Sequence, residues 1–474
     1  MQKKTKIVAT ISDKNCDPKF IKELYNSGMN VVRLNTAHQT FEDSLKVINN
    51  IRKVSDKIAI LVDTKGPEIR TTKVENEIKV REGELIKFKG EPDKISTKEC
   101  VYVTYPDFVD NLSIDSRVLI DDGSVELIVV EKKNDFILCR VLNPGIIEGR
   151  KSINVPATNI NLPALSQKDI EYINFAIDNN LDFIAHSFVR KKEDIIAVKS
   201  ILESKNSKIK IIAKIENQEG VDNLHEILDY AYGVMVARGD LAIEIPSKSI
   251  TRIQKQIVNA CIERRKPVIV ATQMLHSMID NPRPTRAEIS DISNAVYDGV
   301  DALMLSGETA YGKYPIEAVK IMSDIAIDVE SSTNTFRELS PMVISTHTSA
   351  FLVKSAVMAG NELPIKAIIT DTTSGRTVRA LAAFRGRNPI YAQCYSKQTM
   401  RKLTLSYGVY VDYMEPQKTS HEFLQKALIH YSKQKIFDKD NQVLVIAGNF
   451  CRSKGANFIQ IGTVKDLIEF ENMI

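Results

Sequence analysis

A lysine and two carboxylates stand at the ends of two neighbouring apolar runs in this 474-residue chain. Lys214 and Glu216 lie at the end of the run 208–215, and Asp240 follows the run 233–237. Two carboxylates on neighbouring strands can share a hard divalent cation, and Mg²⁺ favours one or two carboxylates together with substrate oxygens. We therefore expect Glu216 and Asp240 to hold Mg²⁺ beside the positive charge of Lys214.

More positive charge lies near the ends of other apolar runs. Arg33, Arg70 and Arg238 lie at or shortly after the ends of three of them. Thr272 closes a fourth. Charged residues at a single strand end could simply be solvated, but here six run ends supply both signs of charge. A metal surrounded by cations and carboxylates suits a small, highly anionic, phosphorylated substrate.

The elements that must position these residues follow an α/β pattern. Runs of about six residues, rich in Ile and Val without strict alternation, are typical of strands buried on both faces of a parallel sheet. Eight of them alternate with amphipathic segments, which predicts a (β/α)₈ TIM barrel whose strand ends form the active face. The predicted strands are 5–10, 30–34, 58–63, 182–187, 208–215, 233–237, 267–272 and 301–305, and the predicted helices include 18–27, 40–53, 167–179, 192–204, 250–264 and 285–297.

About 100 residues interrupt this rhythm after the third strand. Their short alternating runs, at 77–89, 101–104, 117–120, 124–131 and 136–142, with turns at Asp122-Gly123 and Pro144-Gly145, predict an inserted β lid domain. A loop at this end of a barrel strand lies at the catalytic face, so we expect the lid to close over the site. The predicted division is a discontinuous barrel (1–66 and 164–335), a lid (67–163) and a C-terminal α/β domain (345–474).

Composition excludes several classes of protein. Basic and acidic residues number 64 and 60, a net charge of +4, which is too balanced for a protein built on nucleic-acid contacts. No apolar stretch reaches the ~18 residues of a membrane span, and the first residues have no apolar stretch of signal-peptide length. The six cysteines form no CxxC pair, so we expect free thiols and a cytoplasmic setting. From the balanced charge and the absence of a long apolar stretch, we expect neither a nucleic-acid nor a membrane partner.

Eight motifs in this order and spacing resemble those of the pyruvate kinase family. The resemblance covers nearly the whole chain and implies a barrel with a mobile lid and a C-terminal regulatory domain. It also implies transfer of a phosphoryl group from phosphoenolpyruvate to ADP, giving pyruvate and ATP. The motifs are KTKIVATI (4–11), VRLN (32–35), LVDTKGPEIRT (61–71), IIAKIEN (211–217), GVMVARGDL (233–241), PVIVATQML (267–275), NPRPTRAE (281–288) and MLSGETA (304–310).

The resemblance implies a role for each strand-end residue. Glu216 and Asp240 would hold the Mg²⁺ that also binds the substrate. Lys214 would stabilise the charge on the transferring phosphoryl group and the enolate, and Arg33 would contact the phosphoryl group. Thr272 lies where the family protonates the enolate, directly or through water; the alternative is a strand-end hydroxyl bonded only to the backbone.

Substrate and nucleotide contacts are implied in the same way. The backbone N–H of Gly239 would bind the substrate carboxylate. Arg70 and the lid residue Lys151 would contact nucleotide phosphates, and a second Mg²⁺ would arrive with ADP. His38 would border the nucleotide, with a surface histidine as an equally weighted alternative.

The monovalent-cation site departs from the family pattern. In the family a serine is a K⁺ ligand where this chain has Ala37, which lacks a side-chain oxygen. Asn35, Asp63 and the carbonyl of Thr64 remain, and Glu68 stands where K⁺-dependent members carry glutamate. We expect K⁺ dependence to be retained but weakened.

The C-terminal third contains a basic segment. Residues 372–411 hold seven basic and no acidic side chains. Hydroxyls at a strand-to-helix turn, with helix N-terminal N–H groups, form a phosphate cradle, and the resemblance implies a sugar-phosphate or AMP effector there. The alternative is packing and subunit contacts in the homotetramer that the family usually forms. The expected effector residues are Thr372, Thr373, Ser374, Gly375, Arg376, Thr377 and Arg452.

Two other classes of function compete with this hypothesis. Barrel aldolases acting on pyruvate enolates also use a carboxylate-held metal and an arginine, but they lack the inserted domain and the 63–70 motif. A non-catalytic metabolite sensor could keep the fold. The intact Lys214, Glu216, Asp240 and Thr272 argue against it.

Overall fold

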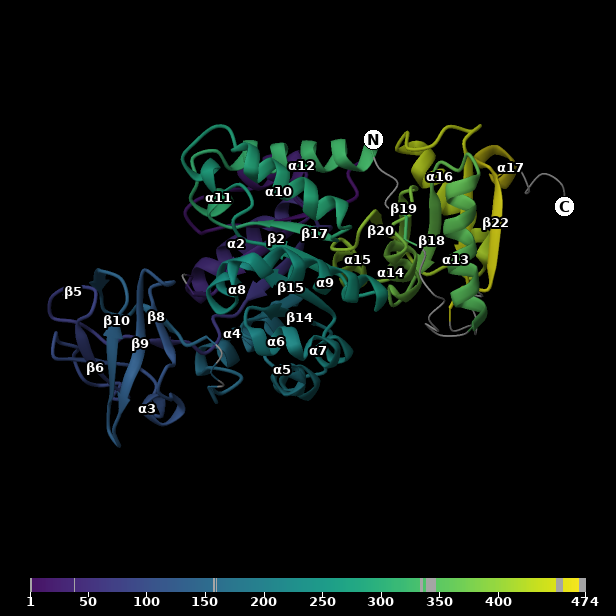
Figure 1. Cartoon of the computed structure of the whole chain (residues 1–474). Coiled ribbons are helices and arrows are strands. Elements are labelled where there is room, and N and C mark those ends of the chain that lie inside the picture. Colours follow the sequence, from purple (N-terminus) through teal and green to yellow (C-terminus); the bar gives the residue numbers. More distant parts are fainter. Residues whose placement is uncertain are drawn as a thin grey trace.

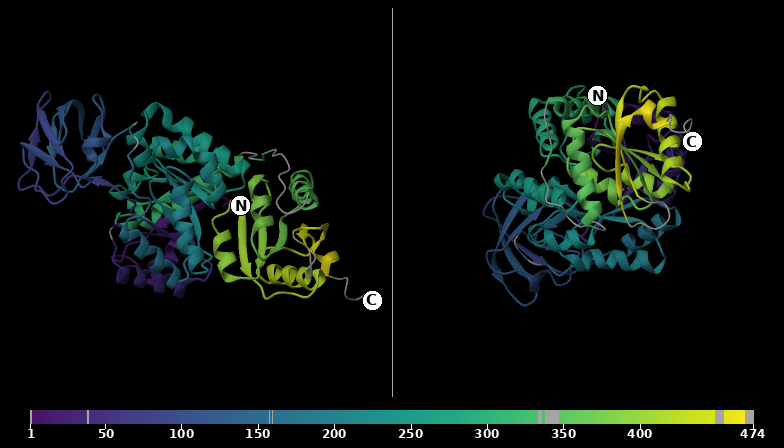
Figure 2. Two further views of the ribbon diagram at one scale, coloured as in Figure 1. Left: turned by 90° about the horizontal axis from the view of Figure 1, so that it is seen from below. Right: turned by 90° about the vertical axis from the view of Figure 1, so that its right-hand side faces the viewer.

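The computed structural model describes residues 2–37, 39–156, 158, 160–332, 336–337, 347–448 and 455–468. A barrel occupies the centre, with a β unit projecting from it and an α/β unit beside it (Figure 1). The left view in Figure 2 shows the same order, so the two smaller units lie on opposite sides of the barrel.

Eight parallel strands close the barrel in the order β1-β17-β16-β15-β14-β13-β3-β2. The predicted TIM barrel is confirmed, and each predicted run matches a strand to within two residues at either end. The strands are β1 (Lys6–Thr10), β2 (Val31–Asn35), β3 (Ala59–Asp63), β13 (Phe183–His186), β14 (Lys210–Ile215), β15 (Gly233–Ala237), β16 (Val268–Ala271) and β17 (Ala302–Leu305).

Helices surround this barrel. Three of them, α2, α4 and α10, begin with a capping box in which a Ser or Thr and an acidic residue three positions later satisfy each other's backbone N–H groups. The helices are α1 (Pro18–Ser27), α2 (Phe41–Val54), α4 (Gln167–Asp178), α5 (Lys192–Ser204), α6 (Gln218–Asp222), α7 (Leu224–Tyr230), α8 (Arg238–Glu244), α9 (Ile250–Glu263), α10 (Arg286–Tyr297), α11 (Gly307–Ala310) and α12 (Pro315–Ser332).

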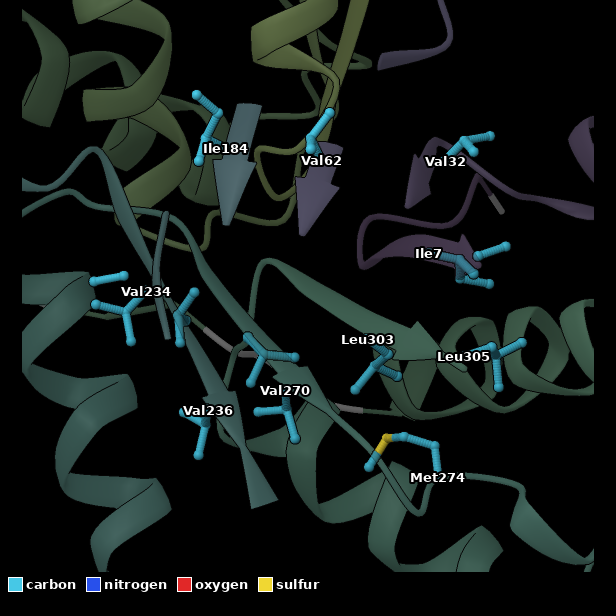
Figure 3. Packing of buried hydrophobic residues seen from close by; sticks show 14 of the residues in the cluster. Ile7, Val32, Val62, Ile184, Val234, Val236, Val270, Met274, Leu303 and Leu305 are labelled. Atoms are coloured by element: carbon cyan, nitrogen blue, oxygen red, sulfur yellow. The ribbon is translucent and has the colours of Figure 1, made fainter. Parts of the chain in front are cut away.

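Alternate side chains of each barrel strand enter two different cores. On β1, Val8 belongs to a cluster to which all eight strands contribute, whereas Ile7 packs with residues of the surrounding helices. Figure 3 shows this second core, with Val32, Val62 and Ile184 projecting from neighbouring strands. Burial on both faces explains why these strands read as continuous apolar runs.

The insert forms a separate β unit with its own core. A seven-stranded sheet has the order β4-β12-β8-β9-β10-β6-β7, and β11 pairs with β5. The elements are β4 (Ile69–Arg70), β5 (Ile78–Val80), β6 (Leu85–Lys89), β7 (Cys100–Tyr102), α3 (Phe108–Asn111), β8 (Arg117–Ile120), β9 (Val125–Lys132), β10 (Ile137–Val141), β11 (Gly145–Ile147) and β12 (Ser152–Asn154).

Two details of the predicted insert are wrong. The single strand expected over 77–89 is two strands, β5 and β6, separated by a tight turn in which Gly83 has φ 83°. Gly145, expected in a turn, begins β11 and pairs with Val80. The short strands β4 and β12, in which Ser152 pairs with Arg70 and Ile153 with Ile69, carry too few residues for a recognisable alternation.

The C-terminal unit contains a five-stranded sheet of order β20-β19-β18-β21-β22, in which only β22 is antiparallel. This agrees with the predicted α/β fold. Its elements are α13 (His347–Glu362), β18 (Ile368–Thr372), α14 (Arg376–Ala383), β19 (Ile390–Cys394), α15 (Lys397–Leu403), β20 (Val409–Tyr413), α16 (Ser420–Lys433), β21 (Gln442–Ala447), β22 (Phe458–Thr463) and α17 (Val464–Ile468).

None of the helices in the described ranges is long and apolar enough to cross a membrane. The five cysteines in those ranges are buried free thiols, as predicted. Cys451 lies outside the described residues.

Candidate active site

Asp63 links the two cations of the barrel end. It closes β3, and its Oδ2 lies 2.6 Å from Nε of Arg33 on β2. Its Oδ1 lies 3.1 Å from Nζ of Lys214 on β14. Burial alone would raise the pKa of the Asp63 carboxyl, but the charges of Lys214 and Arg33 outweigh burial and lower it. Asp63 therefore stays ionised and holds both cations at one place.

Lys214 is buried, and one hydroxyl and two carboxylate oxygens surround its ammonium group. Its Nζ donates to Ser187 Oγ at 2.7 Å and lies 2.9 Å from Glu216 Oε1, in addition to its contact with Asp63. Burial would lower the pKa of the lysine, yet Asp63 and Glu216 hold it above its usual value. Lys214 is thus a permanent cation at neutral pH.

The two carboxylates predicted to hold Mg²⁺, Glu216 and Asp240, are like charges that repel each other. Glu216 Oε2 accepts a hydrogen bond from the Phe188 N–H at 2.6 Å, while its buried Oε1 has only the Lys214 contact. Burial, reinforced by the charge of Asp240, raises the pKa of Glu216 to about 7, although Lys214 opposes this. Burial also raises the pKa of Asp240.

A divalent cation fits this pair of carboxylates. It would remove the like-charge repulsion and give the buried Oε1 of Glu216 a proper partner. The described part of the chain has no group of three or more Asp, Glu, His or Cys side chains able to hold a metal. Two carboxylates completed by substrate oxygens are a donor set typical of Mg²⁺.

Thr272 and Gly239 lie together beside this pair. The Gly239 N–H donates to Thr272 Oγ1 at 2.8 Å, and the hydroxyl donates to the Ala271 carbonyl at 2.6 Å. Thr272 has φ 70°, a conformation that costs free energy for a β-branched residue and is found at functional sites.

Arg238 supports the Thr272 loop through contacts with other protein groups. Its guanidinium donates to the Thr272 carbonyl at 2.8 Å and pairs with Asp291 at 2.7 Å. It thus anchors the strained loop, and the positive charge expected from Arg238 at the site is neutralised by Asp291. Helix α8 also begins directly at Arg238, where the sequence indicated only a strand end.

The lid residues contact groups of the lid itself. Arg70 pairs with Glu68 at 2.6 Å and donates to the Arg150 carbonyl at 2.6 Å. Lys151 lies 3.0 Å from Asp121 Oδ2 and 2.9 Å from a Glu148 oxygen.

A cavity separates the lid from the barrel. It measures about 780 Å³ and is lined by Asp122 of the lid and by Gly239 and Asp240 of the barrel. The cleft therefore reaches the predicted substrate site.

The predicted K⁺ ligands adjoin Asp63 but have protein partners. Asn35 Oδ1 accepts from the Ala37 N–H at 3.2 Å, and the Thr64 carbonyl accepts from Ser187 Oγ at 2.6 Å. The side chain of Ala37 offers no oxygen. His38 lies outside the described residues.

Ser187 is a site residue that the sequence-based prediction missed. It directly follows β13, and its hydroxyl contacts both Lys214 and Thr64. The only signal was its place at the end of an apolar run, and an uncharged serine there drew no attention.

The predicted effector loop lies in the C-terminal unit, away from the barrel end. Thr372 Oγ1 accepts from the Gly375 N–H at 2.8 Å, which folds the loop, and Gly375 has φ 79°. Thr373, Ser374 and Arg376 are exposed. Thr377 lies in the first turn of α14, and Arg452 lies outside the described residues.

Comparisons with known proteins agree along the chain. The family model "Pyruvate kinase, barrel domain" matches residues 2–319, and "Pyruvate kinase, alpha/beta domain" matches residues 351–462. A pyruvate kinase of Borreliella burgdorferi is 46% identical over the whole of both chains. One of Geobacillus stearothermophilus is 40% identical, over 99% of this chain and 81% of the relative. The crystal structure of a pyruvate kinase from Cryptosporidium parvum superimposes with a TM-score of 0.90 at 35% identity, covering 98% of this chain and 96% of that one.

Proposed function

Since this chain belongs to the pyruvate kinase family, whose phosphotransferases convert phosphoenolpyruvate and ADP to pyruvate and ATP in glycolysis, we propose a role in that reaction for each of its site residues. Phosphoryl transfer depends on positioning and on neutralising charge rather than on covalent chemistry. The observation that supports the proposal most is the pair of cations, Arg33 and Lys214, gathered on Asp63.

Arg33 and Lys214 bind the phosphoryl group in this proposal. Both side chains come from barrel strands, and each contacts Asp63 directly. Fixed cations in a buried site stabilise the charge that builds up on the transferred group, because they need no reorganisation during the reaction. Lys214 also stabilises the negative charge of the enolate that is left behind.

Glu216 and Asp240 hold the divalent metal that the family requires, which we propose to be Mg²⁺. The raised pKa values of both carboxyls support this assignment, because burial disfavours their ionised forms and a bound cation would offset that cost. When bound, Mg²⁺ supplies positive charge to the substrate oxygens. The Gly239 N–H orients the substrate carboxylate once it exchanges its bond to Thr272.

Thr272 passes a proton to the enolate, directly or through water, to give pyruvate, and its oxygen regains a proton from water. Its hydroxyl proton is now donated to the Ala271 carbonyl, so the hydroxyl must rotate toward the substrate. Its strained backbone and its place beside Gly239 support this role.

The nucleotide is bound by Arg70, Lys151 and His38, with a second Mg²⁺ carried by ADP. In this proposal residues 67–163 act as a lid on the barrel (1–66 and 164–335). Lys151 reaches the nucleotide phosphates only after leaving Asp121 and Glu148.

K⁺ binds at Asn35, Asp63 and the Thr64 carbonyl, more weakly than in relatives with a serine at position 37. Both Asp63 oxygens already contact cations, which supports weak binding. Replacing K⁺ by an inert monovalent cation should lower activity in part; full activity without K⁺ would contradict the proposal.

Regulation is proposed at residues 345–474. The exposed hydroxyls of Thr373 and Ser374 in the Thr372–Thr377 loop, with Arg452, suit a sugar phosphate or AMP. A homotetramer in the cytoplasm is the assembly and setting that we propose, and the buried free cysteines agree with a reducing compartment.

A lactate-dehydrogenase-coupled assay with phosphoenolpyruvate, ADP and Mg²⁺ tests the reaction. We expect pyruvate formation that requires both ADP and Mg²⁺. Pyruvate released without ADP would indicate a lyase or phosphatase, and no turnover at all would indicate a sensor. Addition of sugar phosphates and AMP to the same assay tests the effector loop.

A further inference from the structure

Ser187 lies at the junction of three active-site elements. It follows β13, is only 2% exposed, and sits between the end of β3 and the Lys214 side chain of β14. Neither a charge nor a known nucleophile arrangement marks it. Its contacts nevertheless bear directly on the position of the Lys214 ammonium.

Two hydrogen bonds lock Ser187 onto Thr64. The Ser187 N–H donates to Thr64 Oγ1 at 3.1 Å, and Ser187 Oγ donates to the Thr64 carbonyl at 2.6 Å. A hydroxyl has one proton and two acceptor lone pairs. The hydroxyl also lies 3.4 Å from Asp63 Oδ1, but its bond to the Thr64 carbonyl is much shorter and takes the proton. The lone pairs are therefore left to face Lys214 Nζ, 2.7 Å away.

The loop that follows β3, the strand paired with β13, leaves little freedom at this point. Gly66 has φ 72°, and a Cβ there would lie 2.9 Å from Ser187 Cβ and 2.8 Å from the Phe188 ring. A glycine at position 66 therefore lets the loop press directly against Ser187. The hydroxyl is fixed by packing as well as by its hydrogen bonds.

Ser187 differs from the other two partners of Lys214. Asp63 is shared with Arg33 at 2.6 Å. Glu216 is the carboxylate that we assign to the metal. Each acidic partner of Lys214 is thus shared with a second cation, Arg33 for Asp63 and the proposed metal for Glu216. The Ser187 hydroxyl is neutral and is hydrogen-bonded to the Thr64 carbonyl.

We propose that Ser187 is a positioning residue for phosphoryl transfer, which fixes the Lys214 ammonium through a hydroxyl locked onto Thr64. This inference rests on the role proposed for Lys214. Ser187 touches no reacting atom itself. It gives Lys214 a partner that neither Arg33 nor the metal shares.

Steady-state kinetics of Ser187→Ala test the proposal. Loss of an outer partner of a catalytic group typically costs about 10-fold or more in activity. We expect kcat to fall by about that factor, with KM for phosphoenolpyruvate and for ADP unchanged within about threefold. A matched control is Ser323→Ala, because Ser323 is also a buried barrel serine that donates to a backbone carbonyl, that of Ser27 at 2.7 Å, far from the site. The control should keep wild-type kcat.

Thermal unfolding of Ser187→Ala, Lys214→Met and the double variant measures whether the two side chains act together. Because Ser187 and Lys214 are in contact, the shifts in unfolding midpoint caused by the two substitutions should not be additive. The shifts caused by Ser323→Ala and Lys214→Met should be additive. Additive shifts, a wild-type kcat in Ser187→Ala, or an equal loss of kcat in Ser323→Ala would each overturn the proposal.

The two proposals fail in different ways. If Lys214→Met itself turns over normally, the role assigned to Lys214 is wrong. If Lys214→Met is inactive and Ser187→Ala is not impaired, only the role of Ser187 is wrong.

Discussion

The chemistry of single residues in this site follows from burial and from charge partners. Asp63 and Lys214 keep their charges because each is buried with opposite charges close by. At Glu216 and Asp240 burial outweighs the charge of Lys214, and their pKa values rise. The sequence predicted these residues because they are charged and end apolar runs. It could not predict Ser187, whose role depends on geometry rather than on residue type.

The Thr272 hydroxyl can be tested by Thr272→Val, which keeps the shape of the side chain. Removing a proton donor should lower kcat, and because water can partly replace the hydroxyl, we expect a loss of about 10- to 100-fold. The KM for phosphoenolpyruvate should stay within about threefold. Thr404→Val serves as the control, since Thr404 Oγ1 contacts only backbone carbonyls, those of Lys57 and Met400. An unchanged kcat in Thr272→Val would remove the threonine from the mechanism.

Asp371 gives a pH-dependent prediction outside the active site. Burial raises the pKa of this carboxyl to about 6, although the Tyr395 hydroxyl donates to it at 3.0 Å. The folded chain therefore binds more protons than the unfolded chain between pH ~4 and ~6, so folding stability falls as pH rises through that window.

The variant Asp371→Asn lacks this titration and still accepts from Tyr395. Relative to wild type, it should gain on the order of 2 kcal/mol between pH ~4 and pH ~7. Denaturant unfolding at both pH values measures this, with the exposed Asp280→Asn as control. A difference between variant and wild type that does not grow with pH would contradict the account.

At the scale of elements, a strand or helix could be predicted where its own residues carry a clear pattern of burial or capping. The barrel strands matched to within two residues because burial on both faces gives long apolar runs. The lid strands β4 and β12 were missed because two or three residues form a strand there only through pairing with a distant segment. The beginning of α8 at Arg238 was also missed, since a strand passes directly into a helix without a cap residue.

The lid provides a test at this scale. Lys151 is held by Asp121 and Glu148, and in the proposed function it leaves them to bind ADP. The double variant Asp121→Asn/Glu148→Gln should lower KM for ADP, by up to about fivefold, since exposed ion pairs contribute up to about 1 kcal/mol. Asparagine tolerates the positive φ of 54° at position 121.

The control for this double variant is Glu126→Gln. Glu126 pairs with Arg117 at 2.7 Å on the same lid, so this variant removes a lid ion pair without touching Lys151. It should leave KM for ADP unchanged. An increase in KM for ADP in the double variant would show that the carboxylates assist nucleotide binding instead of competing with Lys151.

The whole molecule is held together at the end of the barrel opposite the active site. Leu405 of the C-terminal unit packs into the interior cluster of the barrel. Arg385 pairs with Asp301 at 2.7 Å, and Arg401 pairs with the fully buried Asp182 at 2.7 Å. The sequence could not predict these pairs, because their partners lie 84 and 219 residues apart.

Arg385→Met should destabilise the chain strongly. Removing one partner of a buried ion pair leaves an uncompensated charge on Asp301, at a cost of about 3 kcal/mol or more. Denaturant unfolding measures the loss. Lys313→Met is the control, because the Lys313–Asp280 pair is 67% and 69% exposed and should contribute less than about 1 kcal/mol. Equal effects of the two variants would contradict the assigned role of the interface.

The most direct test of the central claim is the turnover of Lys214→Met in the coupled assay. Methionine keeps the approximate volume and removes the cation, so we predict that kcat for ADP-dependent pyruvate formation falls by about 10³-fold while the chain remains folded. Normal turnover by a folded Lys214→Met would contradict the claim that cations held at the barrel end stabilise the transferring phosphoryl group.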